Sequence, residues 1–233
     1  MRLDRGTIVP LASRTMIKEA AQAFFHRYRL LPPAYLHHLA GDFARTLDAL
    51  GLGDGWRERV VAAGSLQPEE RVLEVGAGMA ALAMSIKREH PAVHLEIVEP
   101  RAGALDAARG KAAAWGAEIT THASALTTLP LPDASFDVAF CALQLSRLVA
   151  DEPDVVLREL YRVVRPGGRI VIADLAVGTY AHYLPRELER VVSPLASPLG
   201  GRMGARLADA GFEDVRTAFR WRGLLATWVA RRA

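Results

Sequence analysis

Short apolar segments alternate with helical segments through the middle of the chain, and this alternation limits the possible folds more than any other feature. Strands are predicted at residues 71–75, 93–99, 117–122, 136–143 and 168–175. Helices are predicted between them, at residues 80–90, 103–115 and 153–164. Strands that are joined through helices form parallel sheets whose two faces are both covered. We therefore expect an α/β protein built on a mostly parallel sheet.

The two ends of the chain depart from this alternation. Residues 15–65 have helical apolar spacing, so we expect a helical cap over residues 1–65 ahead of a main domain over residues 66–233. Near the end, the pattern predicts one helix and then two strands, at residues 201–211, 212–221 and 224–232. Because a short turn joins these two strands, the sheet must contain an antiparallel strand.

Composition excludes several classes of protein. A content of 51% hydrophobic and 24% charged residues is typical of a globular chain. The net charge is only +3 and the arginines are spread along the sequence, so no nucleic-acid partner is expected. No uncharged apolar run approaches about 18 residues, so no membrane-spanning helix is expected. The single cysteine, Cys141, cannot form an intramolecular disulfide, and we expect no metal site and a cytoplasmic location.

The stretch RVLEVGAGMAALA, residues 71–83, places a glycine loop between a predicted strand and a predicted helix. Such a loop can hold NAD, FAD, a phosphate or S-adenosylmethionine. Read as Gly76-x-Gly78-x-x-Ala81, it also satisfies a dinucleotide-binding pattern. The loop therefore predicts a nucleotide or nucleoside site without choosing the ligand.

Two acidic residues near this loop narrow the choice. Glu74 lies where dinucleotide-binding loops have an apolar residue, and a buried carboxylate costs several kcal/mol unless it meets a partner. The α-ammonium of S-adenosylmethionine would be such a partner, whereas NAD has no such cation; alternatively, Glu74 caps the following helix or pairs with an arginine. Glu99, at the end of the second strand, can accept the ribose hydroxyls of either ligand, or is a solvated acid.

Three blocks in order resemble the class I S-adenosylmethionine-dependent methyltransferases: VLEVGAG (72–78), LPLPDASFDVAF (129–140) and LRELYRVVRPGGRIVIADL (157–175). The resemblance extends from about Trp56 to Ala230, and within the family it is greatest to the quinone-ring C-methyltransferases of ubiquinone and menaquinone synthesis. It implies a Rossmann-like fold with a seven-stranded, mostly parallel sheet, an antiparallel edge strand and an N-terminal helical lid.

The same resemblance implies particular roles for residues of these blocks. The residues expected to bind S-adenosylmethionine are Glu74, Gly76, Ala77, Gly78, Glu99, Pro100, Ala125, Leu126 and Cys141. Pro100, Arg101 and Leu126 are candidates for the walls of the adenine slot. Asp137, which begins the fourth strand, is expected beside the cofactor cleft. Pro166-Gly167-Gly168 is expected to turn the chain from a helix into the fifth strand.

The chain departs from the family pattern at three places. Ala80 replaces the third glycine of the loop, which is tolerable at negative φ and costly at positive φ. Ala125 replaces the aspartate that accepts a hydrogen bond from the adenine amine, a loss of about 0.5–1.5 kcal/mol. Residues 144–147, Gln-Leu-Ser-Arg, replace a histidine pair that relatives often have after the fourth strand.

Methyl transfer needs alignment and exclusion of water, and it needs a base only when the nucleophile holds a tightly bound proton. Asp174 ends the fifth strand, and Tyr180 and His182 follow it. We predict these three as catalytic residues, with His182 as a candidate base. The alternative is that they are structural, as most histidines and aromatic residues are.

The expected function is methyl transfer from S-adenosylmethionine to a small, fairly apolar acceptor, a quinone-like or natural-product ring, with C-methylation favoured. One alternative is O- or N-methylation of another metabolite. A second is a methyltransferase-like domain that serves as a partner subunit or a non-methylating catalyst, which Ala80 and Ala125 favour. The only other partner left open is a second copy of the chain, in a homodimer.

Overall fold

The computed structural model describes residues 55–149, 151–176, 202–221 and 225–233. They belong to one compact unit, Asp54–Ala233. Its strands are β1 (Arg71–Val75), β2 (His94–Val98), β3 (Thr120–His122), β4 (Phe136–Ala142), β5 (Val164–Leu175), β6 (Glu213–Trp221) and β7 (Leu225–Arg231). Its helices are α3 (Gly55–Gly64), α4 (Ala81–Glu89), α5 (Ala102–Trp115), α6 (Glu152–Val163) and α8 (Met203–Asp209), with the short 3₁₀ helix η2 (Leu145–Arg147).

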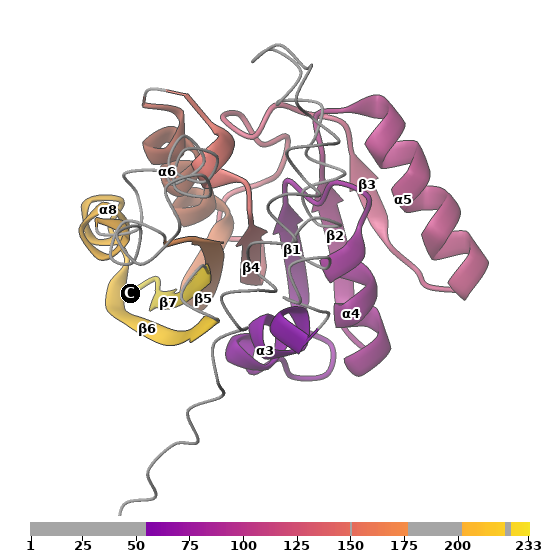
Figure 1. The fold of residues 1–233 in the computed structure, drawn as a ribbon, viewed down its shortest axis with the longest axis horizontal. Helices are drawn as coiled ribbons and strands as arrows, with labels where there is room; N and C mark the ends of the chain where they lie inside the picture. Colours follow the sequence, from indigo (N-terminus) through magenta and orange to yellow (C-terminus); the bar gives the residue numbers. More distant parts are fainter. Residues whose placement is uncertain (1–54, 150, 177–201, 222–224) are drawn as a thin grey trace, which may run out of the picture. The chain divides into compact units, whose positions relative to one another are not determined.

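The strands form one seven-stranded sheet in the order β3-β2-β1-β4-β5-β7-β6 (Figure 1). The five strands from β3 to β5 are mutually parallel. The expected α/β fold is confirmed, but the antiparallel strand lies one place inside the edge. It is β7, which pairs with β5 from Arg169–Arg231 to Leu175–Leu225 and with β6 on its other side, so that β6 forms the edge.

Two hydrophobic clusters cover the two faces of the sheet. One contains core residues of α6, α8 and the segment before β4, and the other contains core residues of α3, α4 and α5. Side chains alternate between faces along a strand, and β1 shows this: Leu73 and Val75 belong to the first cluster and Val72 to the second. Glu74 therefore projects from β1 toward the face that α3 and α4 cover.

The prediction for Pro166-Gly167-Gly168 is wrong in detail. Helix α6 leads directly into β5 at Val164, and the three residues lie inside that strand. Phe136 pairs with Val164 and Val138 with Arg169, so the extra residues bulge out of the ladder. A side chain at Gly168 would lie 2.8 Å from the carbonyl oxygen of Asp137, which explains the glycine in a strand.

The other predicted elements within the described residues are found with shifts of up to a few residues at their ends. The predicted helices of residues 15–54 lie outside the described residues. Among the described residues, no helix is both long enough and apolar enough to cross a membrane.

Candidate functional site

The loop between β1 and α4 passes the carboxyl end of β2. The N–H of Gly76 donates to the carbonyl of Val98 at 2.8 Å, and the Gln144 side chain donates to the carbonyl of Gly76 at 2.7 Å. Gly76 has φ +73° and Gly78 has φ +54°, and a side chain at Gly76 would collide with Gln144. Glycine is therefore required at Gly76 by both conformation and space.

Ala80 completes the loop in a left-handed conformation, with φ +58°. Replacing the third glycine of the loop by alanine is costly only if φ at this position is positive, and φ at Ala80 is positive. A left-handed alanine costs roughly 1 kcal/mol relative to the right-handed region. Its methyl group is fully buried in the cluster under α4, which offsets part of that cost.

Glu74 is 3% exposed, at the carboxyl end of β1. The main-chain N–H of Ala83, in the first turn of α4, donates to its carboxylate, so the expected helix-capping contact is present. Its Oε2 has no hydrogen-bond partner among the described residues. Burial raises the pKa of Glu74 to about 8, and the charge of Glu99 adds to the shift, while those of Arg57 and Lys111 oppose it. A buried acceptor atom thus remains available to a cationic donor.

Glu99 lies directly after β2 and is 1% exposed, so the solvated alternative for this residue is wrong. Its Oε2 accepts the N–H of Gly78 at 2.8 Å. Its Oε1 accepts the main-chain N–H of Arg101 at 3.1 Å and the Nε of the same arginine at 2.7 Å. The glycine loop therefore lies between two buried acids at the carboxyl edge of the sheet, where ligands of this type of fold bind.

The remaining predicted cofactor residues differ in exposure. Pro100 and Ala125 are exposed, whereas Ala77 and Leu126 are buried. Ala125 belongs to a turn in which its carbonyl accepts the N–H of Thr128 at 3.4 Å. Cys141 lies beside Val75 in the sheet, and burial raises the pKa of its thiol well above the ordinary value. Its thiol is enclosed in the core instead of facing the loop.

Of the predicted catalytic residues, Tyr180 and His182 lie outside the described residues. Asp174 is buried near the end of β5, and its Oδ2 accepts the main-chain N–H of Ser146 at 3.1 Å. This contact ties η2 to the sheet close to the glycine loop. Asp137 is not beside that loop: it binds the N–H of Arg71 at 2.7 Å and Arg165 at 2.5 Å, at the opposite, amino edge.

Two residues of the site, Gln144 and Arg147, are not predicted from the sequence as parts of it, whereas Arg101 is predicted there only as a wall of the adenine slot. Gln144 holds the loop, and Arg101 binds Glu99. Arg147 is half-buried within reach of the charges of Glu99 and Asp174, and burial and the charge of Arg101 lower its pKa. Gln144 and Arg147 are visible in the sequence only as replacements for histidines. Arg101 has a local signal, because it follows Glu99 by two residues.

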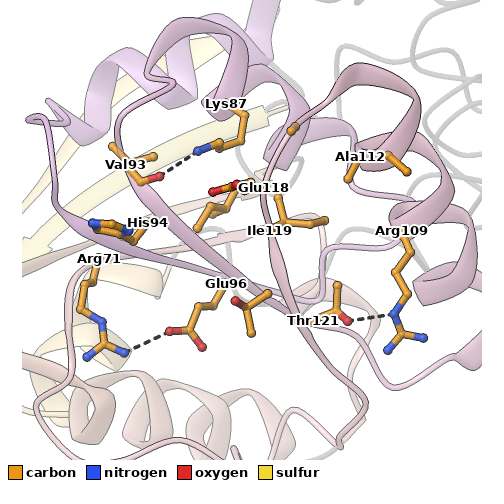
Figure 2. Close-up of a pocket in the computed structure, with 14 residues that line it drawn as sticks. Arg71, Lys87, Val93, His94, Glu96, Arg109, Ala112, Glu118, Ile119 and Thr121 are labelled. Atoms are coloured by element: carbon orange, nitrogen blue, oxygen red, sulfur yellow. Dashed lines mark hydrogen bonds and ion pairs between the residues drawn. The ribbon is translucent and has the colours of Figure 1, made fainter.

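A separate hollow of about 900 Å³ lies near the amino ends of β2 and β3, away from the glycine loop (Figure 2). Several of its charged groups are bound within the chain: Arg71 pairs with Glu96 at 3.0 Å, and Lys87 donates to the carbonyl of Val93 at 2.9 Å. Among the described residues, no group of histidine, cysteine and acidic side chains could hold a metal ion. We therefore place the functional site at the carboxyl edge.

Comparison with known proteins finds methyltransferases by sequence and by structure. A family model described as a methyltransferase domain matches residues 72–168. A demethylmenaquinone methyltransferase of Deinococcus radiodurans is 29% identical over 191 residues, which is 81% of this chain and 76% of the relative. One of Mycolicibacterium vanbaalenii is 30% identical over 215 residues, 82% of this chain and 88% of the relative.

Solved structures share the fold. A SAM-dependent methyltransferase from Aquifex aeolicus superimposes with a TM-score of 0.64 at 20% identity, covering 94% of this chain and 98% of that one. The [4+2]-cyclase SpnF superimposes with a TM-score of 0.64 at 21% identity, covering 77% of this chain and 81% of that one.

Proposed function

The chain belongs to the class I S-adenosylmethionine-dependent methyltransferases, and on that premise we propose that it methylates a small, fairly apolar ring compound, with carbon as the favoured acceptor atom. Two relatives are named for methylation of demethylmenaquinone, which supports a quinone-like acceptor. The absence of a strongly basic net charge is consistent with a small-molecule acceptor and with no nucleic-acid partner.

The residues at the carboxyl edge fit S-adenosylmethionine, which supplies an activated methyl group when bound. The observation that carries the proposal is the buried, unpartnered Oε2 of Glu74, because the α-ammonium of this cofactor supplies the donor that the atom lacks. Glu99 would accept the ribose hydroxyls. Gly76, Ala77 and Gly78 would let the ligand approach the main chain closely.

The adenine end of the proposed site lacks a carboxylate at position 125, where the family pattern has an aspartate. Pro100 and Leu126 would form walls of the adenine slot, and Ala125 leaves the adenine amine to a carbonyl, a hydroxyl or water. The loss of one hydrogen bond of about 0.5–1.5 kcal/mol weakens binding without abolishing it. Because the thiol of Cys141 is buried, this residue would contact the cofactor only through its main chain, or act on the cofactor indirectly through the core residues around it.

For the reaction, the chain contributes alignment and exclusion of water. Asp174 would orient the acceptor or the groups around it, because it is buried at the carboxyl edge and already fixes η2. Tyr180 and His182 follow β5 in the sequence and would face the acceptor, with His182 available to take a proton.

Two properties of the protein as a whole complete the proposal. The single cysteine is compatible with a reducing compartment, and we place the protein in the cytoplasm. A homodimer is proposed as the alternative to a monomer.

A second candidate function is catalysis without methyl transfer, as a methyltransferase-like domain. The left-handed Ala80 and the missing carboxylate at Ala125 favour it, because both weaken cofactor binding. The buried, unpartnered oxygen of Glu74 opposes it, because a domain that binds no cation has no use for it.

Two experiments test the proposal. In calorimetric titrations of the full chain, S-adenosylhomocysteine should bind and NAD should not; tighter binding of NAD would refute the cofactor assignment. Incubation with isotopically labelled S-adenosylmethionine and reduced demethylmenaquinone should then give a product labelled on ring carbon. Binding of S-adenosylhomocysteine without transfer to any quinone-like ring would favour the second candidate.

A further inference from the structure

Arg101 lies across the ribose end of the site. It is the residue before α5, and both its main-chain N–H and its Nε donate to the same oxygen of Glu99, at 3.1 and 2.7 Å. Its guanidinium also lies against the glycine loop: Nη2 is 3.6 Å from the position that a Cβ on Gly78 would take. This side chain therefore fills the space between Glu99 and the loop, where the nucleoside would lie.

The hydrogen-bonding capacity of Glu99 shows the consequence. Each carboxylate oxygen offers about two lone-pair directions. Arg101 uses both on Oε1, and Gly78 uses one on Oε2, so one remains. A ribose diol brings two hydroxyl donors, and it cannot place both on Glu99 until the Nε of Arg101 leaves.

Burial indicates which partner moves. The Glu99 side chain is 1% exposed and held by two main-chain N–H groups, whereas the Arg101 side chain is 46% exposed. An exposed guanidinium loses little when it returns to water. Arg147 lies close enough for its positive charge to oppose that of Arg101, which lowers the cost of displacement.

We propose that Arg101 is a placeholder for the ribose diol, which the bound nucleoside displaces, so that this residue sets the affinity of the site. The inference rests on the proposed function, because it takes S-adenosylmethionine as the ligand. The main-chain N–H of Arg101 stays on Glu99 throughout, and only the Nε–Oε1 hydrogen bond is exchanged for a ribose hydroxyl.

The test measures binding of S-adenosylhomocysteine by calorimetry to the full chain and to Arg101→Met. Removing the competitor should tighten binding roughly two- to fivefold, the range expected for an exposed ion pair. Arg109→Met is the matched control. Arg109 lies on α5, the helix that follows Arg101, and its side chain is 52% exposed. It binds Asp106 and, as Figure 2 shows, Thr121. This control loses the same charge and should leave the affinity unchanged.

A second ligand separates displacement from a general effect of charge. A 2′-deoxy analogue of S-adenosylhomocysteine needs only the acceptor position that is open on Oε2, so Arg101→Met should not tighten its binding. Arg101→Lys keeps the charge but loses the Nε donor, and it should tighten S-adenosylhomocysteine binding as Arg101→Met does.

Three outcomes overturn the inference: weaker binding by Arg101→Met, an equal gain for both ligands, or an equal gain for Arg109→Met. A failure of the unaltered chain and of the control to bind S-adenosylhomocysteine at all would instead refute the proposed function, and this inference with it.

Discussion

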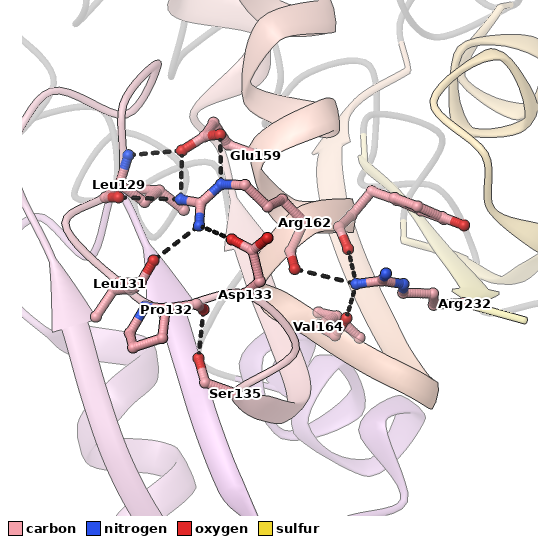
Figure 3. A network of polar contacts seen from close by, with 10 residues as sticks. Leu129, Leu131, Pro132, Asp133, Ser135, Glu159, Arg162, Val164 and Arg232 are labelled. Atoms are coloured by element: carbon pink, nitrogen blue, oxygen red, sulfur yellow. Dashed lines mark hydrogen bonds and ion pairs between the residues drawn. The ribbon is translucent and has the colours of Figure 1, made fainter.

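Two of the arginine–carboxylate clusters around this sheet differ in which partner the chain holds in place. At the carboxyl edge, the carboxylate of Glu99 is buried and the guanidinium of Arg101 is half-exposed. In the other cluster, the guanidinium of Arg162 is the centre (Figure 3). It donates twice to Glu159 at 2.8 Å, to Asp133 at 2.6 Å, and to the carbonyls of Leu129 and Leu131 at 3.0 and 2.8 Å.

The Arg162 cluster joins α6 to the segment that leads into β4. Glu159 completes it by accepting the N–H of Leu129 at 2.8 Å. Beside it, Arg232 donates to the carbonyls of Tyr161, Arg162 and Val164, at 2.8, 3.0 and 2.7 Å (Figure 3). Arg162 thus donates to three carboxylate oxygens and two main-chain carbonyls.

The difference shows how the same pair of residue types serves structure or binding. Five hydrogen bonds use the guanidinium of Arg162, so it has no capacity left for a ligand, and moving it would break all five at once. The Nε of Arg101 makes one hydrogen bond to one acid, and water can replace it. Glu74 resembles the Glu99–Arg101 pair in being available to a ligand, because one of its oxygens has no partner among the described residues.

Arg162→Met should have the largest effect, because it breaks the structural cluster. We expect a loss of about 3 kcal/mol in the free energy of unfolding, measured by urea denaturation. Arg158→Met removes an exposed arginine of the same helix and should change stability by less than about 0.5 kcal/mol. The folded Arg162→Met protein should still bind S-adenosylhomocysteine with unchanged affinity. A lower affinity in fully folded protein would contradict the assignment of the Arg162 cluster to structure and of the Glu99–Arg101 pair to binding.

That cluster also predicts a response to acid. The hydrogen bond from Arg162 lowers the pKa of Glu159, so its stabilising contribution is present near neutral pH and is lost as the pH falls through the lowered value. Arg162→Met should remove this part of the acid sensitivity, which denaturation curves between about pH 3 and pH 6 would reveal.

Glu74→Gln should have the next largest effect, and with the opposite sign. Because the pKa of Glu74 rises from 4.5 to about 8 on folding, the folded chain keeps a proton that the unfolded chain has lost between these values. The contribution of Glu74 to the free energy of unfolding is therefore fully present below pH 4.5 and is lost as the pH rises to about 8. Glutamine does not ionise, which removes a penalty of about 4 kcal/mol at pH 8. Burial of its unpaired amide costs about 2 kcal/mol, so the variant should be more stable at pH 8 by about 2 kcal/mol.

The same variant should bind S-adenosylhomocysteine at least about tenfold more weakly, because an amide cannot form the charged pair. Stability and binding would then change in opposite directions, as expected of a residue kept for a ligand. Lower stability at pH 8 together with unchanged binding would place Glu74 among the structural residues, beside Glu159.

Ala80→Gly should have the smallest effect, and it sharpens the comparison by relieving strain within the binding loop. Glycine removes the cost of the left-handed conformation but loses a buried methyl group and gains freedom in the unfolded chain. We expect a net gain of about 0.5 kcal/mol in thermal or chemical denaturation. Ala83→Gly, one turn into α4, is the control and should lower stability by about 1 kcal/mol; a loss in both variants would show that φ at Ala80 carries no strain.

The sequence predicts the strands of the sheet because each is a short apolar run bounded by turn residues, and it predicts the site's two acids because charged residues at the ends of buried strands are unusual. It does not predict that Glu74 both caps α4 and keeps one oxygen without a partner, since that depends on the packing of α3 and α4. Gln144 reaches Gly76 across 68 residues, a contact without any local signal. The position of β7 inside the edge depends on pairing between distant strands.

The central claim is that the buried Glu74 carboxyl receives the α-ammonium of the cofactor, and proton exchange on binding tests it most directly. With a pKa of about 8, Glu74 holds a proton in the free site near neutral pH and must release it to pair with the cation. Calorimetry of S-adenosylhomocysteine binding at about pH 6.5, in buffers of different ionisation enthalpy, should show release of close to one proton per site. The residual binding of Glu74→Gln should release none. Tight binding by the unaltered chain without proton release would contradict the claim.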